Sequence, residues 1–456
     1  MKNESLIEQL ADWVVSFDAG KIPPDVAAQA KHLLLDTLGC ALAAHNEDAF
    51  QAASATINEI DGAAHCTVIG SNERTSLPNA VLLNGALIRS LDLNDIYMGP
   101  GQTGHPSDTL AVALSVAESE RSTGEELLAA IVLGYEIYGR LADLAEHGTA
   151  WDYVTLSGLV APAMAGRLMK MNRAVLAHAL AIGVAQGHTL AGVRSGQLSG
   201  AKNLANALNT SRALLATLLA KHGVTGPMQI LDGPRGFAAA VYGGADLTAL
   251  VRPAAPPFRI MDTSIKAFPC VGTAQTIAAA AVQAHGLAQN PAEIATVKIR
   301  LADVPLVKRQ LQDDERRHPR TRETADHSFY YLAAAGILDG DISVDSFKRR
   351  RWRDDDLTAF MQRIEISTDA GLNEHLPGTF PCVMELIFGS GSKKTVEMIH
   401  APGSLKKRMT QSQLEGKFRQ NAAARLSATK QDQVIQWVTS CGPASQVTAL
   451  MESLRP

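Results

Sequence analysis

Apolar residues recur every three or four positions through about the first 250 residues, which is the spacing of helices with one buried face. Segment 23–44 opens with two prolines, which suit a first helical turn, and continues with leucine and alanine at this spacing. Segment 107–120 opens with a serine that can cap a helix, and segment 203–223 ends at a glycine, as helices often do. No repeat of fixed period is evident, so we expect a helical bundle rather than a solenoid.

The pattern changes after the proline-rich segment 251–258. Apolar and polar residues then alternate over 295–301 and 363–367, as they do in half-buried strands. Two short β-type runs flank a Gly/Ser turn within 383–400, which predicts a hairpin. After 402–404 the helical spacing returns.

The order of these patterns predicts a mostly α fold in which both chain ends build one large all-helical domain. We assign residues 1–260 and 402–456 to this domain, and residues 261–401 to a smaller α+β lid domain inserted into it. A chain of 456 residues also exceeds what one hydrophobic core usually fills, which favours two domains.

The charge balance indicates no polyanionic partner. Lys and Arg number 42 against 46 Asp and Glu, with a pI near 6.4, so we expect neither nucleic acid nor a membrane surface as a partner. The basic cluster in 348–356 is neutralised by neighbouring acids, and we interpret it as a solvated face.

Other features are typical of a cytoplasmic protein. The five cysteines form no CxxC pair, which argues against a zinc ribbon or an iron–sulfur cluster, and their odd number suits a reducing compartment. Acids interrupt the first apolar stretch, so the N-terminus does not resemble a signal peptide. The longest stretch without acidic or basic residues, 174–193, contains histidines, a glutamine and glycines, so we expect a buried helix rather than a membrane span.

Polar residues gather in segment 91–110, LDLNDIYMGPGQTGHPSDTL. Helical spacing would place Asp92 and Asp95 on neighbouring faces, with Asn94 between them in the sequence. His105 must lie in a loop, because its Gly- and Pro-rich flanks cannot be helical. It precedes the start of the next expected helix, a position that favours anionic ligands. The alternative is that Asp95 caps a helix and His105 contacts a buried carbonyl.

Three further stretches contain polar residues whose positions call for an explanation. Lys202 lies near the start of a helix, where a cation is disfavoured unless an anion is held there too. Lys266 precedes a Phe-Pro turn, and Gln275 follows in the next expected helix. His327 and Tyr331 are four residues apart, which places them on one face of a helix. A solvated lysine and a His–Tyr pair within the core are the alternatives.

Together these residues favour one kind of chemistry. Two lysines, a tyrosine, a histidine and a carboxylate, without a metal-ligand motif, suit binding and proton transfer on a small polycarboxylate. Neither GxxxxGK[ST] nor GxGxxG is present, so the sequence gives no sign of a nucleotide site.

The combination resembles the MmgE/PrpD family, which includes 2-methylcitrate dehydratase, cis-aconitate decarboxylase and iminodisuccinate epimerase. The resemblance extends over nearly the whole chain and is carried by the motifs LDLND…GHPSD, SGAKNLANA, KAFPC, ADHSFYYLAAAGILDG and EGKF. It implies a large helical domain with a smaller α+β lid, a homodimer, and chemistry that needs neither a cofactor nor a metal.

The resemblance also implies a site. The decarboxylase branch of the family has site residues that correspond here to Asp92, His105, Lys202, Lys266 and Tyr331. We expect the catalytic residues to be Asp92, His105, Lys202 and Tyr331. We expect the substrate to be bound by Lys266, Asn94, Asp95, Tyr153 and Gln275.

Several positions distinguish the branches of the family. Asn94, Asp108 and Gln275 are similar to the 2-methylcitrate dehydratase branch, and the KP(L/M)H sequence of the decarboxylases and the epimerase is absent at Lys202. Two positions depart from the decarboxylase pattern. Ile96 stands where that branch has threonine, and Tyr153 stands where many members have histidine.

The resemblance implies a hydro-lyase that dehydrates a 2-methylcitrate-like tricarboxylate, a reaction of propionate metabolism. In this scheme two lysines clamp carboxylates, and His105 and Asp92 transfer a proton. Tyr331 is the acid near the leaving hydroxyl, or a hydrogen-bond donor there. A cis-aconitate decarboxylase-type lyase and an epimerase or isomerase of a small dicarboxylate are the alternatives. A non-catalytic helical scaffold is disfavoured because none of these site residues has been lost.

Overall fold

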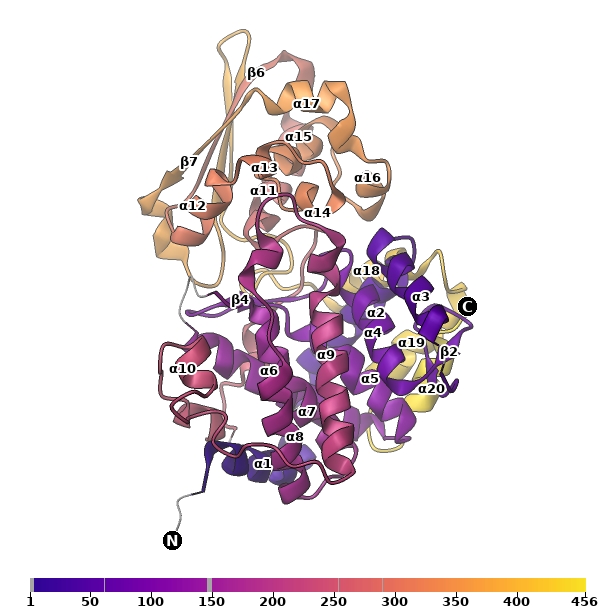
Figure 1. The fold of residues 1–456 in the computed structure, drawn as a ribbon. Coiled ribbons are helices and arrows are strands. Elements are labelled where there is room, and N and C mark those ends of the chain that lie inside the picture. Colours follow the sequence, from indigo (N-terminus) through magenta and orange to yellow (C-terminus); the bar gives the residue numbers. More distant parts are fainter. Residues whose placement is uncertain (1–3, 61, 146–149, 253, 289) are drawn as a thin grey trace.

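A computed structural model describes residues 4–60, 62–145, 150–252, 254–288 and 290–456. The protein is mostly α-helical, as expected, with only short strands outside one four-stranded sheet (Figure 1). The larger, helical part contains α1 (Leu6–Ser16), α2 (Pro24–Ala43), α3 (Asp48–Ile60), α4 (Leu77–Arg89), α5 (Leu110–Ser119), α6 (Gly124–Leu144), α7 (Ser157–Leu168), α8 (Arg173–Gln186), α9 (Gly200–Lys221), α10 (Phe237–Val241), α18 (Gln411–Ala422), α19 (Ala428–Thr439) and α20 (Val447–Ser453).

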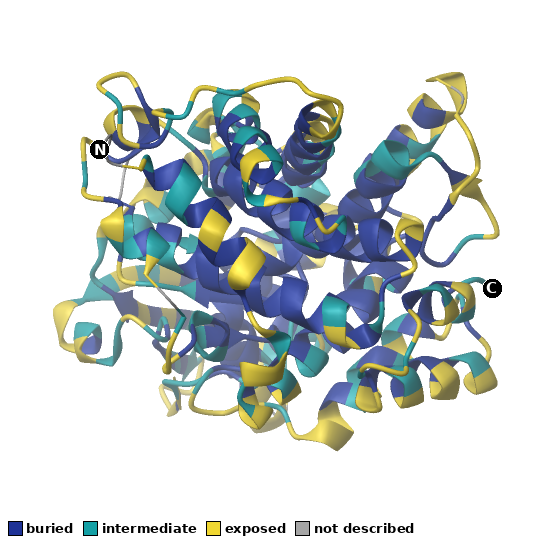
Figure 2. Cartoon of the chain, turned by 90° about the horizontal axis from the view of Figure 1, so that it is seen from below, coloured by how far each residue is buried: buried dark blue, intermediate teal, exposed yellow. Residues whose placement is uncertain are grey.

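One hydrophobic core joins these helices, and it takes residues from 6–265 and again from 414–454. Buried positions concentrate on the central helices and exposed positions on the rim (Figure 2). The C-terminal helix α18 packs against α2, where Gly39 lets the ring of Phe418 approach closely. The two chain ends therefore share one core (Figure 1).

The smaller part is built on a sheet with strand order β7-β6-β8-β9. Its helices and strands are α11 (Gln275–Leu287), β6 (Ile294–Ala302), α12 (Pro305–Gln312), α13 (Asp314–Arg317), α14 (Arg322–Ala325), α15 (Phe329–Asp339), α16 (Val344–Lys348), α17 (Asp355–Met361), β7 (Ile364–Asp369), β8 (Cys382–Phe388) and β9 (Lys393–Met398). The predicted strands and the β8–β9 hairpin are confirmed.

Apolar residues cross this sheet in one row and pair in the order Ile366, Ile299, Met384 and Val396. Helices α11 and α15 pack against each other and against the sheet. A second hydrophobic core, formed by residues from 270 to 396, fills the space between them. We therefore keep the proposal of two domains, with one residue of the expected linker, 253, lying outside the described residues.

Short strands bring distant loops together beneath the smaller part. Strand β3 (Ile96–Met98) pairs antiparallel with β4 (Thr103–Gly104) and with β5 (Thr263–Ser264). The loop after Asp92 and the segment leading to Lys266 are thereby neighbours. A second small ladder joins β1 (Cys66–Thr67) to β2 (Arg74–Thr75).

Three local expectations are wrong. Helix α4 ends at Arg89, and Asp92 adopts the left-handed conformation with φ of 51°, so helical spacing does not relate Asp92 to Asp95. Ser107 is not an N-cap, because it lies inside the 3₁₀ turn Pro106–Thr109 that precedes α5.

The third concerns His327, which precedes α15 instead of sharing a helix face with Tyr331. The side chain of Ser328 caps this helix by accepting a hydrogen bond from the Tyr331 amide at 3.1 Å. A cap residue has extended backbone, so the helix cannot reach back to His327.

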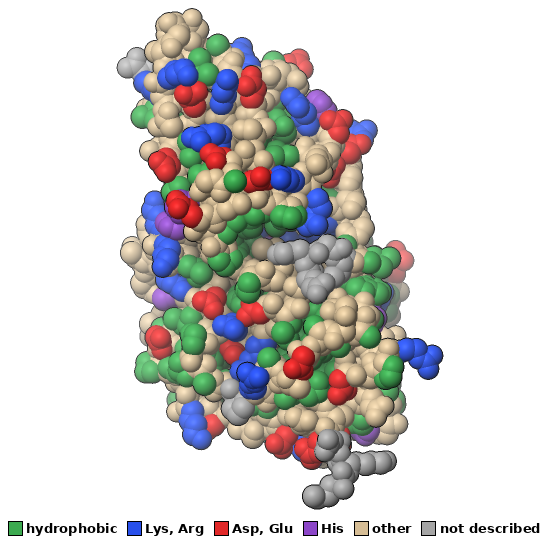
Figure 3. All heavy atoms as spheres, turned by 90° about the vertical axis from the view of Figure 1, so that its left-hand side faces the viewer, with side chains coloured by type: hydrophobic (Ala, Val, Ile, Leu, Met, Phe, Trp, Pro, Cys, Tyr) green, Lys and Arg blue, Asp and Glu red, His purple; other side chains and the backbone are tan. Residues whose placement is uncertain are grey.

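On the face shown in Figure 3, side chains of both charge signs are interspersed rather than gathered by sign. Among the described residues, no helix combines the length and apolarity that a membrane crossing requires. The apolar stretch 174–193 contains most of α8, which contributes to the larger core.

Candidate active site

A cavity of about 670 Å³ lies between the larger and smaller parts. Its walls come from segments 89–196 and 271–327, which belong to different hydrophobic cores. Its charged lining residues are Arg89, Arg194, Arg309, Arg316, Asp92, Asp152 and Asp313, together with His105 and His327. The mixture of arginines and histidines suits an anionic ligand that takes part in proton transfer.

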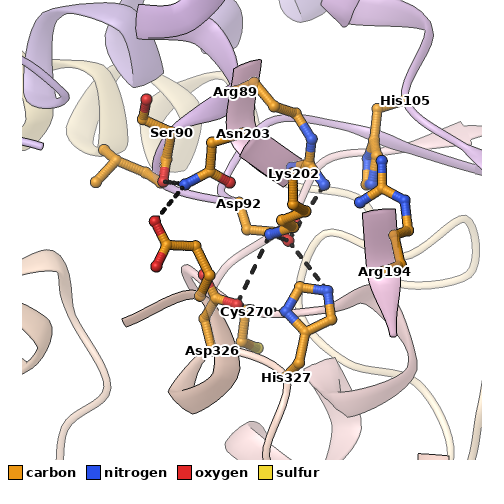
Figure 4. Close-up of polar contacts among 12 residues, drawn as sticks. Arg89, Ser90, Asp92, His105, Arg194, Lys202, Asn203, Cys270, Asp326 and His327 are labelled. Carbon is orange, nitrogen blue, oxygen red and sulfur yellow. Dashed lines mark hydrogen bonds and ion pairs between the residues drawn. The ribbon is translucent and has the colours of Figure 1, made fainter. Parts of the chain in front are cut away.

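Asp92 is the centre of a buried ion cluster at the base of this cavity (Figure 4). Its carboxylate contacts Arg89 Nη1 at 2.9 Å and Lys202 Nζ at 2.8 Å, and it also accepts from Lys266. Lys266 Nζ donates in addition to the Asp92 carbonyl at 3.0 Å. The left-handed turn at Asp92 is therefore held through its main chain and its side chain.

The cations decide the ionisation of this group. Burial acts to raise the pKa of Asp92, but Arg89, Lys202 and Lys266 outweigh it and hold that pKa well below its usual range. Asp92 is therefore a carboxylate, and its oxygens are already occupied by cations. Both ammonium groups bind Asp92, and neither lysine is among the residues that line the cavity.

His105 faces the cavity from the loop before α5. Its Nδ1 lies 2.5 Å from the carbonyl oxygen of Asp95, which can only accept, so Nδ1 carries the proton. Burial, with the charges of Arg89 and Lys266, keeps the pKa of His105 well below its usual range. The ring is therefore neutral, with its lone pair on Nε2, which is the form that a general base requires.

A second histidine faces the cavity from the smaller part, paired with an adjacent acid. His327 Nδ1 is hydrogen-bonded to Asp326, and its Nε2 lies 3.5 Å from the carboxylate of Asp92. Burial and the charge of Lys202 lower the pKa of His327 to about 3, although Asp326 opposes this. Asp326 is itself held by Arg322 at 2.7 Å.

Tyr153 lies in the cavity wall between two arginines. Its hydroxyl accepts a hydrogen bond from Arg89 at 3.2 Å, and the guanidinium of Arg194 lies 4.3 Å from the ring centre. Its ring also meets that of His105 edge to face. Arg194 is fixed by Asp152 at 2.6 Å. Tyr153 thus connects the predicted base to the cationic wall.

The smaller part adds donors from its helices α12 and α13. Arg316 binds Asp313 at 3.1 Å, while its buried Nη1 has no hydrogen-bond partner among the described residues. Arg309 and Gln310 also line the cavity. A buried guanidinium nitrogen without an acceptor is unfavourable, and a ligand carboxylate would satisfy it.

Three of the predicted substrate-binding residues lie behind the cavity wall. Asn94 donates to Ser107 and Asp108, and Asp95 accepts from the hydroxyl of Tyr135 at 2.7 Å. Gln275 bonds to the main chain of segment 267–270 through both amide atoms. These residues shape the loops that carry His105 and Lys266.

Tyr331 does not join the cluster. It lies in the second hydrophobic core, where its ring packs against Phe347 and Trp352, and it does not line the cavity. The structure therefore gives the expected acid near the leaving hydroxyl no support at this position.

Among the described residues, one triad offers ligand atoms within 4.8 Å of one another, close enough for a metal ion: Asp92, Asp326 and His327. Both carboxylates already accept contacts from lysine or arginine side chains. A divalent ion would add two positive charges beside these cations, so the donor set suits a charge cluster better than a metal centre.

Comparison with known proteins agrees with this architecture. Residues 8–250 match the MmgE/PrpD N-terminal domain, and residues 268–441 match the MmgE/PrpD C-terminal domain. This chain belongs to the MmgE/PrpD family. The interval between the two matches contains the change from one hydrophobic core to the other. The C-terminal match continues into α18 and α19, which nevertheless pack in the larger core.

Three relatives show how far the similarity extends. The human cis-aconitate decarboxylase is 25% identical over 492 residues, covering 100% of this chain and 95% of the relative. The mouse cis-aconitate decarboxylase is 25% identical over 457 residues, covering 93% of this chain and 88% of the relative. A cis-aconitate decarboxylase-like protein of Aspergillus oryzae, oryM, is 29% identical over 240 residues, which is 49% of this chain and 48% of that protein.

The sequence prediction missed several cavity residues. Arg89, Arg194 and Arg316 were not singled out, and His327 was noted only for its spacing from Tyr331. The adjacent acid and histidine in ADHS were the one signal available for the Asp326–His327 pair. Nothing local in the sequence distinguishes the arginines from those on the surface.

The buried carboxyl of Asp95 predicts a specific pH dependence of stability. Burial raises its pKa to about 7 in the folded protein, above the value of about 3.9 expected for the unfolded chain. The folded state then binds this proton more tightly, so the contribution of Asp95 to stability falls as pH rises from about 4 to 7, by at most about 1.4 kcal/mol per pH unit. Asp95→Asn cannot ionise, so its stability relative to the wild type should increase over this range.

Urea unfolding midpoints measured at steps from pH 4 to pH 7 test this expectation. Asp345→Asn, at a side chain that is 75% exposed, serves as the control variant. A difference between Asp95→Asn and the wild type that stays constant with pH would contradict the assignment.

Proposed function

We propose that the protein is a lyase that acts on a small tricarboxylate by proton transfer next to a carboxylate, with dehydration of a 2-methylcitrate-like substrate as the reaction. The observation that supports this most directly is the neutral His105. It lines the same cavity as four arginines, and its lone pair is on Nε2. A base among cations is what abstraction of a proton α to a carboxylate requires.

In the proposed mechanism, the arginines of the cavity bind the carboxylates of the substrate. His105 Nε2 removes the proton from the α carbon, and negative charge develops on the adjacent carboxylate. Arg89 and Arg194 stabilise that charge. Both contact Tyr153, whose ring packs against the ring of His105. Positioning of the reacting carbon by these fixed cations lowers the barrier further.

His327 is our candidate for the proton donor to the leaving hydroxyl. Its Nδ1 is oriented by Asp326, and its Nε2 lies on the cavity side near Asp92. A bound tricarboxylate adds negative charge beside the ring, which favours the protonated form. The β-hydroxyl would then leave as water while the C–C double bond forms.

Decarboxylation of cis-aconitate is the second candidate, supported by the human relative that matches this chain over its whole length. Loss of carbon dioxide also produces a carbanion next to a carboxylate, and the same cations would stabilise it. A histidine would then protonate the carbon instead of removing a proton. We further keep a homodimer, a cytoplasmic location, an independence of cofactors and a role in propionate metabolism as proposals.

Proton NMR in D2O is the experiment that separates these reactions. The purified, EDTA-treated protein is incubated with 2-methylcitrate, citrate and cis-aconitate separately. We expect the methyl doublet of 2-methylcitrate to be replaced by the singlet of a methyl group on a double bond, and this change should survive chelation. Itaconate from cis-aconitate would assign the decarboxylase reaction instead, and no change in any of the three substrates would contradict both candidates.

Replacement of His105 tests the base directly. We expect His105→Gln to lower kcat by about 10² to 10⁴-fold, the usual contribution of a general base. His285→Gln is a matched control, because His285 Nδ1 also contacts a backbone carbonyl, that of Ile337 at 2.8 Å, outside the cavity. Equal turnover by the two variants, with similar melting temperatures, would exclude His105 as the base.

A further inference from the structure

Lys417 of helix α18 reaches from the C-terminal part of the chain to the underside of the Asp92 cluster. Its Nζ lies 2.5 Å from Asp36 Oδ1 on α2, 2.7 Å from the carbonyl oxygen of Lys266 and 3.2 Å from the carbonyl oxygen of Leu93. The side chain is 11% exposed. One ammonium group therefore binds one carboxylate and two main-chain carbonyls.

The two carbonyls belong to two loops that meet at the cluster, one with Asp92 and one with Lys266. Leu93 directly follows Asp92, and Lys266 is one of the cations on the Asp92 carboxylate. Lys266 Nζ in turn donates to the Asp92 carbonyl at 3.0 Å. The two loops are therefore connected in two ways. Lys417 donates to one carbonyl in each loop. Lys266 donates to the carbonyl and the carboxylate of Asp92 in the other loop.

These loops need such support. Asp92 has a left-handed backbone, which a residue with a side chain adopts only when its surroundings favour it. Its neighbours Leu91 and Leu93 are buried, yet they belong to neither a helix nor a strand. A carbonyl in such a turn needs a donor from elsewhere in the protein, and for Leu93 that donor is Lys417.

Helix α18 also has apolar contacts that dock it without Lys417. Leu414, Phe418 and Ala422 of this helix are buried in the larger core and pack it against α2. Asp36 supplies the countercharge, although burial raises the pKa of this carboxyl. Burial of the Lys417–Asp36 pair has a desolvation cost, which apolar attachment of the helix would not require. We therefore attribute the pair to the support of the loops.

We propose that Lys417 is a positioning residue, which fixes the Asp92 loop and the Lys266 loop relative to each other so that the ion cluster and the adjacent cavity wall keep their geometry. Its effect on turnover rests on the proposed function, but its effect on the loops does not. The C-terminal segment would then complete the site without touching the substrate.

Hydrogen–deuterium exchange of the substrate-free, full-length protein tests the positioning role. In Lys417→Met we expect the amides of 88–98 and 262–270 to exchange at least about tenfold faster, with the amides of 411–422 unchanged. Arg419→Met is the matched control on the same helix, because its side chain is 42% exposed and pairs with Asp432 at the surface. This control should change neither loop.

Unchanged exchange in both loops of Lys417→Met would overturn the proposal, and so would faster exchange throughout α18, which would make Lys417 an anchor of the helix. If Lys417→Met does not fold, Lys417→Gln, which keeps a donor and loses the charge, is measured in the same way. Faster exchange in the two loops of that variant supports the proposal, and unchanged exchange contradicts it.

Kinetics then separate this proposal from the proposed function. With a substrate that the wild type converts, we expect Lys417→Met to lower kcat by about 10²-fold, as a small misplacement of reacting groups does, while Arg419→Met retains wild-type kcat. Faster loop exchange together with wild-type kcat would overturn the catalytic part. A wild type that converts no tricarboxylate would refute the proposed function and leave the exchange result to decide the positioning role.

Discussion

The buried carboxylate of Asp92 and its three cations are the interaction on which the rest of the site depends. Moving one carboxylate and the cations of Arg89, Lys202 and Lys266 out of water is unfavourable unless each is closely paired, and here all of them meet at one point. The cluster joins α4, α9 and the loop that enters the smaller part. It therefore fixes the relative position of three segments that are far apart in the sequence.

The cavity follows from this arrangement. The lysines bind Asp92 behind the cavity, whose cationic lining consists of arginines from both parts, beside His105 and His327. Each histidine has one ring nitrogen tied to a fixed acceptor, so the other nitrogen has a defined direction. A substrate bound in the cavity would contact two arginines and one histidine from each of the two parts.

Periodicity was sufficient to predict the mostly α-helical fold and the strands of the sheet, because apolar spacing reports directly which face of each element is buried. It failed where single residues interrupt the pattern, at the left-handed Asp92 and at the Ser328 cap before α15. For the site, Asp92 and His105 stood out locally, whereas the partners of Arg89 and Arg194 depend on contacts between distant segments. Those contacts are set by packing, which one sequence does not display.

A crystal structure of the protein with tricarballylate, a tricarboxylate without the hydroxyl group, would show which cations bind the carboxylates of a substrate. We expect its carboxylates to bind the arginines of the cavity, a methylene carbon to lie near His105 Nε2, and the two lysines to remain on Asp92. A ligand carboxylate bound directly to Lys202 and Lys266, with Asp92 displaced, would contradict it.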